Sequence, residues 1–231
     1  MKKLLLVGNW KSHKTLQEAH TFMIAFLNNS FIEWLHTHAE NEDKSKRIII
    51  CPPILLIPDL DRMLEQIQAK IPIDLGVQDI SPFPIGSHTG EVAASEIVGL
   101  AKYVIVGHSE RRKEFGETDE LVFQKVNAAK ESGLEPIFCV QGKDTAVPEG
   151  IKIVAYEPIG AIGSAHPDDP QHAESVAAFF KEEKHIPFVL YGGSITAENV
   201  SLYTTKPHID GVLVGGASLD PTSFSEIIQR A

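Results

Sequence analysis

The sequence lacks the features on which membrane insertion, secretion and disulfide-based folds depend. Its 231 residues include only 2 cysteines. Both lie inside apolar runs, at Cys51 and Cys139, without the spacing of a metal knuckle or a disulfide framework. The apolar run at 4–7 is too short for a signal peptide, and no run approaches the ~20 residues of a membrane span. These absences predict a cytoplasmic protein with two buried, reduced thiols and no membrane partner.

Basic residues are also scarce. The chain has 21 Lys and Arg against 31 Asp and Glu, a formal net charge of −10, and no Lys/Arg cluster that could follow a nucleic-acid backbone. Nucleic acid is therefore not an expected partner. An anionic ligand would be repelled by the overall charge, so its site would need local positive potential from a lysine, helix N-termini or backbone N–H groups.

What the chain does contain is a recurring alternation of apolar runs and helical stretches. Continuous rather than alternating hydrophobicity predicts strands covered on both faces, which is typical of parallel sheets. The eight predicted strands are 4–10, 47–52, 73–78, 103–108, 135–140, 152–157, 188–193 and 210–216. The predicted helices are 15–38, 57–69, 94–101, 118–132, 171–184, 196–204 and 221–229.

This order predicts an α/β protein, either a (β/α)8 barrel or a doubly wound sheet, in a single domain over residues 1–231. One connection breaks the pattern. Residues 141–150 (QGKDTAVPEG) are too few and too rich in Gly, Pro and Asp for an ordinary helix. We expect the fifth helix to be missing or reduced to a turn.

Polar residues at the carboxyl ends of the strands are the candidates for chemistry in a parallel barrel. Two pairs, Asn9 with Lys11 and His108 with Glu110, are spaced two apart and would project to one side, and Gln78 and Glu157 end two further strands. Taken alone, Lys11 could be a surface lysine and His108 a core histidine. A carboxylate that ends an apolar strand, as Glu157 does, must be compensated or serve as a base.

Glycine pairs follow the last two predicted strands, at 192–193 and 215–216. Without side chains, backbone N–H groups can approach a ligand there, and barrels often bind phosphate at this place. Ser194 follows the first pair and could also cap a helix. The nucleotide-binding glycine fingerprints are absent, and the sequence GHSER at 107–111 lacks the closing glycine of a serine-hydrolase elbow.

Five motifs, in order along nearly the whole chain, resemble the triosephosphate isomerase family: GNWK (8–11), VGHSERR (106–112), AYEPI (155–159), YGGS (191–194) and DGVLVGGASL (210–219). The resemblance implies the (β/α)8 barrel. It also implies interconversion of dihydroxyacetone phosphate and D-glyceraldehyde 3-phosphate through an enediolate, in glycolysis and gluconeogenesis, without cofactor or metal.

The family resemblance also implies roles for particular residues. Glu157 would be the base, His108 the electrophile, and Lys11 the positive charge beside Asn9. Backbone N–H groups would hold the phosphate, and Ser109 and Glu110 would support the lysine and the histidine. The phosphate-binding residues implied are Gly163, Ser194, Gly215 and Gly216.

The chain departs from the family pattern at both ends of the lid that follows the base. Gly160 stands where the family usually has tryptophan, and His166 and Pro167 stand in the far hinge. We therefore expect altered lid kinetics with intact chemistry. Residues 79–92 resemble the family's protruding dimer loop, which implies a homodimer; a tetramer is the alternative if the missing fifth helix leaves an apolar stripe uncovered.

Two other functions remain compatible with the residues. Another phosphosugar isomerase or an aldolase would use a similar barrel, although a Schiff-base aldolase needs a lysine deep in a late strand, where only Lys152 occurs, at an entry end. A barrel that binds small phosphorylated metabolites without turnover is the second alternative.

Overall fold

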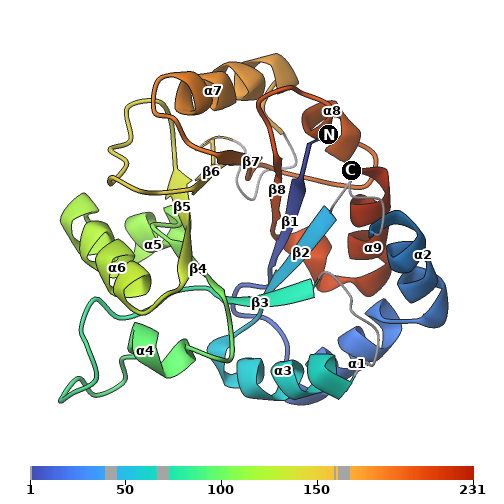
Figure 1. The fold of residues 1–231 in the computed structure, drawn as a ribbon, viewed down its shortest axis with the longest axis horizontal. Helices are drawn as coiled ribbons and strands as arrows, with labels where there is room; N and C mark the ends of the chain where they lie inside the picture. Colours follow the sequence, from blue (N-terminus) through green and yellow to red (C-terminus); the bar gives the residue numbers. More distant parts are fainter. Residues whose placement is uncertain (1, 40–45, 67–72, 159, 161–166) are drawn as a thin grey trace.

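Eight parallel strands close into a barrel in sequence order, β1 to β8, with β1 paired to β8 (Figure 1). The structure is a computed structural model that describes residues 2–39, 46–66, 73–158, 160 and 167–231. Closed pairing decides between the two predicted architectures in favour of the (β/α)8 barrel. The strands are β1 Leu4–Asn9, β2 Lys46–Cys51, β3 Ile73–Val77, β4 Tyr103–Val106, β5 Glu135–Val140, β6 Ile153–Tyr156, β7 Phe188–Tyr191 and β8 Gly211–Val214.

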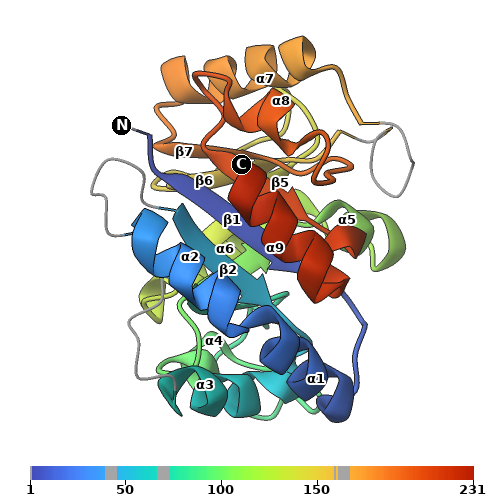
Figure 2. The same ribbon diagram turned by 90° about the vertical axis from the view of Figure 1, so that its right-hand side faces the viewer.

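Helices surround the strands on the outside of the barrel. They are α1 Leu16–Phe26, α2 Asn29–Ala39, α3 Ile57–Gln66, α4 Ala94–Ile97, α5 Ser109–Glu114, α6 Asp119–Glu131, α7 Pro170–Glu182, α8 Val200–Thr204 and α9 Pro221–Arg230, with the 3₁₀ turns η2 Ile54–Leu56 and η3 Gly216–Leu219. Helices α1 and α9, from opposite ends of the chain, pack side by side (Figure 2). The rings of Phe26 and Phe224 stack between them.

Three predicted helices differ from the structure, and α5 was not predicted. The helix predicted over 196–204 begins only at Val200, after a turn at 197–199. The single helix predicted over 15–38 is two helices, because Asn28 interrupts it: its side-chain amide donates to the carbonyl of Ala25 (2.8 Å), and its Oδ1 accepts from the N–H of Phe31 (3.0 Å). The helix predicted over 94–101 ends at Ile97, since Val98 is extended and Gly99 has φ +90°.

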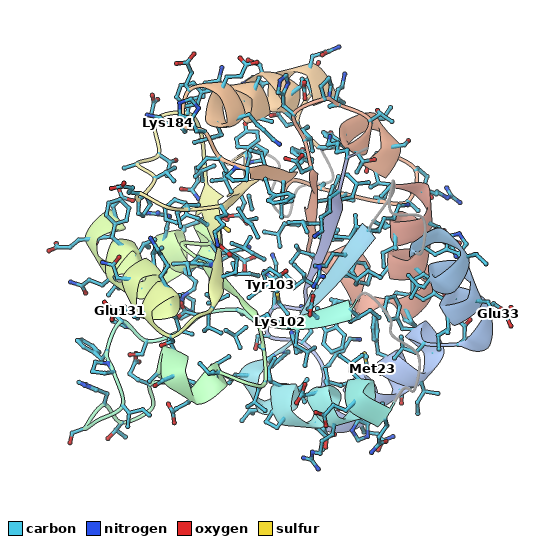
Figure 3. The ribbon with its side chains drawn as sticks, in the orientation of Figure 1. Met23, Glu33, Lys102, Tyr103, Glu131 and Lys184 are labelled. Carbon is cyan, nitrogen blue, oxygen red and sulfur yellow. The ribbon has the colours of Figure 1, made fainter. Side chains whose placement is uncertain are left out.

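The core has two layers, one inside the barrel and one between the strands and helices. Along β1, Leu5 and Val7 face inward while Leu6 faces the helices, so the runs are apolar throughout. The interior layer also contains both cysteines as free, fully buried thiols. Figure 3 shows side chains filling the barrel, with Tyr103 near its centre.

The connection from β5 to β6 differs from the others. Residues 141–152, all of which the structure describes, form turns and bends and contain no helix. In Figure 1 a loop occupies this part of the outer ring, between α6 and α7. The Lys130 ammonium of α6 donates to the carbonyl of Glu149 (3.0 Å), and Val147 packs against the outer core.

In the described ranges, no helix combines the length and the apolar character needed to cross a membrane.

Candidate active site

The carboxyl ends of the strands meet around one cavity of about 510 Å³. The side chains of Asn9, Lys11, His108 and Glu157 line it from the ends of β1, β4 and β6. Ser194, Gly215 and Gly216 line it from the segments after β7 and β8. The structure thus brings together residues that are separated by up to 207 positions in the chain, as the sequence analysis expected for a barrel.

Glu157 follows β6 directly and is 1% exposed. Its backbone N–H donates to the carbonyl of Val140 (2.8 Å), which continues the pairing of β6 with β5. The carboxylate is held by two donors: the backbone N–H of Ser109 lies 2.9 Å from Oε2, and Nε2 of His108 lies 2.9 Å from Oε1. Each oxygen of this buried carboxylate therefore has a hydrogen-bond donor.

His108 follows β4 as the N-cap residue of α5. Its Nδ1 accepts a hydrogen bond from the backbone N–H of Glu110 (3.2 Å), so the single proton of a neutral imidazole is on Nε2, facing the cavity. Burial lowers the pKa of His108, but the hydrogen bond to Glu157 and the charge of that carboxylate outweigh burial. The pKa of His108 is therefore raised above 6.5. Glu157 makes the larger contribution to this rise, and the Glu110 carboxylate adds to it.

Lys11 has a left-handed backbone, with φ +51°, two residues after the end of β1. Three contacts hold it there. Oδ1 of Asn9 accepts from its N–H (3.0 Å), the Gln78 amide donates to its carbonyl (2.8 Å), and its ammonium pairs with the Glu110 carboxylate. The sequence placed Gln78 at a strand end but did not reveal that it holds the lysine backbone.

The glycine pairs serve two different purposes. A Cβ on Gly192 would lie 3.0 Å from Cγ of Glu157, and a Cβ on Gly193 would lie 2.1 Å from the Tyr191 hydroxyl. The first pair therefore makes room for the carboxylate and for a tyrosine. Gly215 faces Lys11, whose Cε would be 3.4 Å from an added Cβ, and nothing lies within 4 Å of one on Gly216.

Of the predicted lid, the structure describes both flanks. Gly163 and His166 lie outside the described residues, Gly160 is exposed, and Pro167 lines the cavity. Asp168 is bound by three tyrosines that sequence reasoning missed: its N–H donates to Tyr191 (2.8 Å), and its carboxylate and carbonyl accept from Tyr156 (3.1 Å) and Tyr203 (2.6 Å).

A network of buried charges lies beside His108. Glu117, 5% exposed, accepts from Arg111 (2.6 Å) and Lys125 (2.5 Å), and the same two cations pair with Asp79 at 2.8 and 2.7 Å. These contacts join α5 and α6 to the segment after β3. Burial opposes ionisation of Glu117, but the two cations outweigh it and lower its pKa.

Arg112 braces the turn that precedes His108. Its Nε donates to the carbonyl of Gly107 (3.0 Å), and its guanidinium pairs with Asp119 (2.6 Å). Gly107 has φ +71°, and an added Cβ would lie 3.0 Å from Val122 and 3.1 Å from the Arg112 guanidinium.

Within the described ranges, no group of three or more His, Cys, Asp or Glu side chains could hold a metal ion.

Comparison with known proteins gives a consistent result over the whole chain. The family model described as triosephosphate isomerase matches residues 4–231. Triosephosphate isomerase of Symbiobacterium thermophilum is 36% identical, covering 100% of this chain and 98% of its own. That of Synechococcus sp. (strain JA-3-3Ab) is 38% identical, covering 99% and 95%. The crystal structure of triosephosphate isomerase from Bartonella henselae superposes with a TM-score of 0.79 at 27% identity, covering 99% of both chains.

Proposed function

The chain belongs to the triosephosphate isomerase family, and we propose that Glu157, His108 and Lys11 carry out the family's reaction in it. That reaction is the interconversion of dihydroxyacetone phosphate and D-glyceraldehyde 3-phosphate, a step of glycolysis. The observation that supports this assignment is the convergence of the three side chains on one cavity that glycines line on its other side.

Glu157 is the base in this proposal. Its carboxylate leaves the Ser109 N–H and His108, takes a proton from the substrate carbon, and the electron pair of that C–H bond moves to form the enediolate, which leaves negative charge on the carbonyl oxygen. The carboxylic acid then returns the proton to the neighbouring carbon. Glu157 ends in its starting state, so the reaction consumes no oxidant, reductant or cofactor.

His108 and Lys11 stabilise the charge that develops on oxygen. The Nε2–H of neutral His108 donates to the carbonyl oxygen and moves a proton between the two enediolate oxygens, while the Lys11 ammonium supplies positive charge. A neutral imidazole is expected because, once Glu157 has turned to the substrate, burial and the Glu110 N–H at Nδ1 both act against protonation. The general principle of a Glu base with a neutral His electrophile is the one established for this enzyme family.

The phosphate is held by backbone N–H groups of Ser194, Gly215 and Gly216, and by that of Gly163 outside the described residues. Such donors attract a dianion without adding net charge, and Lys11 supplies the full positive charge beside them. This arrangement answers the problem posed by the net charge of −10. Ser109 and Glu110 support the site by holding Glu157 and pairing with Lys11.

A coupled assay with glyceraldehyde 3-phosphate, run beside Glu157→Gln at equal folded concentration, tests the assignment. We expect wild-type turnover, and a fall in kcat of about 10²- to 10⁴-fold in the variant, the usual contribution of a general base. Absence of wild-type turnover, together with binding of phosphoglycolate, would instead identify a barrel that binds phosphorylated metabolites without catalysis.

The oligomer we propose is a homodimer formed through residues 79–92. Phe83 and Ile85 are 47% and 69% exposed on this segment. A second cavity, of about 570 Å³, opens beside the active site and is lined by His13, Arg111 and Phe115 among others. A protruding apolar segment of one copy fits such a cavity in another. Sedimentation equilibrium of wild type and Ile85→Glu distinguishes the dimer from a tetramer held elsewhere and from a monomer.

A cytoplasmic location belongs to the same proposal. Cys51 and Cys139 are free and fully buried inside the barrel, which suits a reducing compartment.

A further inference from the structure

Lys14 combines an unfavourable backbone with a specific set of side-chain contacts. It has φ +77°, three residues after Lys11 at φ +51°. Residues with a Cβ rarely adopt a positive φ, and where they do the surrounding structure must hold the backbone there. Two such residues in one short connection between β1 and α1 indicate a segment whose shape is fixed by tertiary contacts.

The Lys14 ammonium provides those contacts. It donates to the carbonyl of Leu219 (2.7 Å) and lies 5.2 Å from the ring centroid of Trp10 and 4.8 Å from that of Phe22. Trp10 is fully buried and Phe22 is 2% exposed, so the cation sits at the edge of the outer core. The following residue, Thr15, closes a capping box with Glu18 and fixes the start of α1.

Leu219 is the last residue of η3, which begins at Gly216. The hydrogen bond from Lys14 therefore joins the segment that carries Lys11 to the segment that carries the phosphate-binding glycines. The Lys11 side chain also faces Gly215 at the cavity, where its Cε would lie 3.4 Å from a Cβ added to the glycine. The hydrogen bond of Lys14 therefore joins, away from the cavity, the same two segments that approach each other at the cavity through Lys11 and Gly215.

We propose that Lys14 is a positioning residue that sets the separation between the Lys11 ammonium and the phosphate-binding backbone of Gly215 and Gly216. This inference rests on the proposed function of the site. In a triose phosphate the reacting oxygens and the phosphate are a few bonds apart. Groups that bind both ends must therefore be held at a matching separation before the substrate arrives.

Two probes separate this role from a general effect on binding. Phosphoglycolate would occupy both the phosphate-binding backbone and the position of the reacting carbons, whereas inorganic phosphate would occupy the phosphate-binding backbone alone. Lys14→Met keeps the stem over the rings and removes the ammonium. In this variant we expect the inhibition constant of phosphoglycolate and the KM of glyceraldehyde 3-phosphate to rise about tenfold. The inhibition constant of inorganic phosphate should change by less than about twofold. Lys14→Arg should restore most of the loss because it retains a cationic donor.

The chain offers a matched control. The Lys46 ammonium donates to the carbonyl of Ile228 (2.7 Å) and lies 5.2 Å from the Trp34 ring, the same pair of contacts at the amino end of β2, away from the site. Lys46→Met should leave both inhibition constants and KM unchanged while lowering the melting temperature. Lys14→Gly is a second test variant, since glycine adopts φ +77° without strain and the loss of the side chain is then tested apart from backbone strain.

The inference would be overturned if the wild-type protein turns over substrate and the folded Lys14→Met and Lys14→Gly variants have unchanged inhibition constants for phosphoglycolate. That result would leave the proposed function intact. Equal weakening of phosphate and phosphoglycolate would also overturn it, because it would show that Lys14 shapes the phosphate site rather than its distance from Lys11. Failure of the proposed function is distinct, since it would appear as a lack of wild-type turnover.

Discussion

Nε2 of His108 lies 2.9 Å from Oε1 of Glu157. The proposed electrophile and the proposed base are therefore hydrogen-bonded to each other at rest. In the proposed mechanism, a substrate that contacts both groups replaces this buried hydrogen bond with one contact to each. The protonation state of the imidazole is thereby linked to where the carboxylate points.

The first prediction concerns this link. Glu157 favours the imidazolium and raises the pKa of His108 above 6.5, while burial favours the neutral ring. Glu157→Gln removes the carboxylate that contributes most to this rise and leaves burial, so the pKa of His108 should fall even though Glu110 still raises it. Titration of the His108 ring by ¹⁵N NMR in both proteins measures the shift. An unchanged His108 titration would contradict the contact described here.

A second prediction concerns stability and pH. Arg111 and Lys125 hold the pKa of Glu117 below 4.5 in the folded protein. Its contribution to the free energy of unfolding is therefore complete above pH 4.5 and is lost as the pH falls through the lowered folded value. Glu117→Gln should reduce that free energy by about 2 kcal/mol at pH 7, with the difference from wild type vanishing in acid. Urea unfolding from pH 7 down to pH 3 tests this, and a difference that grows in acid would refute it.

Glycine substitutions after β7 and β8 should differ in cost. A Cβ on Gly193 would lie 2.1 Å from the Tyr191 hydroxyl, whereas one on Gly216 would meet nothing within 4 Å. Gly193→Ala should lower the free energy of unfolding by about 1–3 kcal/mol, and Gly216→Ala should leave it nearly unchanged. Denaturant unfolding of the pair compares them directly. If Gly193→Ala has the same free energy of unfolding as Gly216→Ala, the Tyr191 ring moves aside without a cost in stability.

The brace on Gly107 gives a kinetic prediction. A lysine at position 112 cannot bond the Gly107 carbonyl and Asp119 at once, because it lacks the planar fork of arginine. Freed from the brace, His108 loses its alignment, so Arg112→Lys should lower kcat about tenfold with little change in KM. Arg62→Lys, an exposed residue of α3 paired with Asp59 at 3.5 Å, is the control that should change neither. A change confined to KM would assign Arg112 to substrate binding instead.

The barrel strands were predictable because burial on both faces produces an unbroken apolar run in the sequence, such as 48–51. The helices were less so. Asn28 is compatible with a helix interior in sequence, and only its capping of α1 and α2 reveals the break. Likewise, α4 is short because Gly99 adopts a positive φ, which the sequence permits but does not require.

Strand ends identified the residues that line the cavity, since parallel strands in a barrel must end together. The contacts between those residues depend on register and rotamers that no local pattern encodes. The Ser109 backbone N–H on Glu157, the Gln78 amide on Lys11 and the tyrosines around Asp168 belong to this class. The closest available signal was the placement of Gln78 at a strand end.

The pairing of β1 with β8 determines when, during synthesis of the chain, the barrel can close and the site can form. Leu5 pairs with Gly211 and Gly8 with Val214, so the first strand made by the ribosome needs one of the last as its second neighbour. At ~5–20 residues per second, β1 waits about 10 to 40 s with one edge exposed. Lys11 is made 204 residues before Gly215, so a chain released between these two points would carry the lysine without the glycines opposite it.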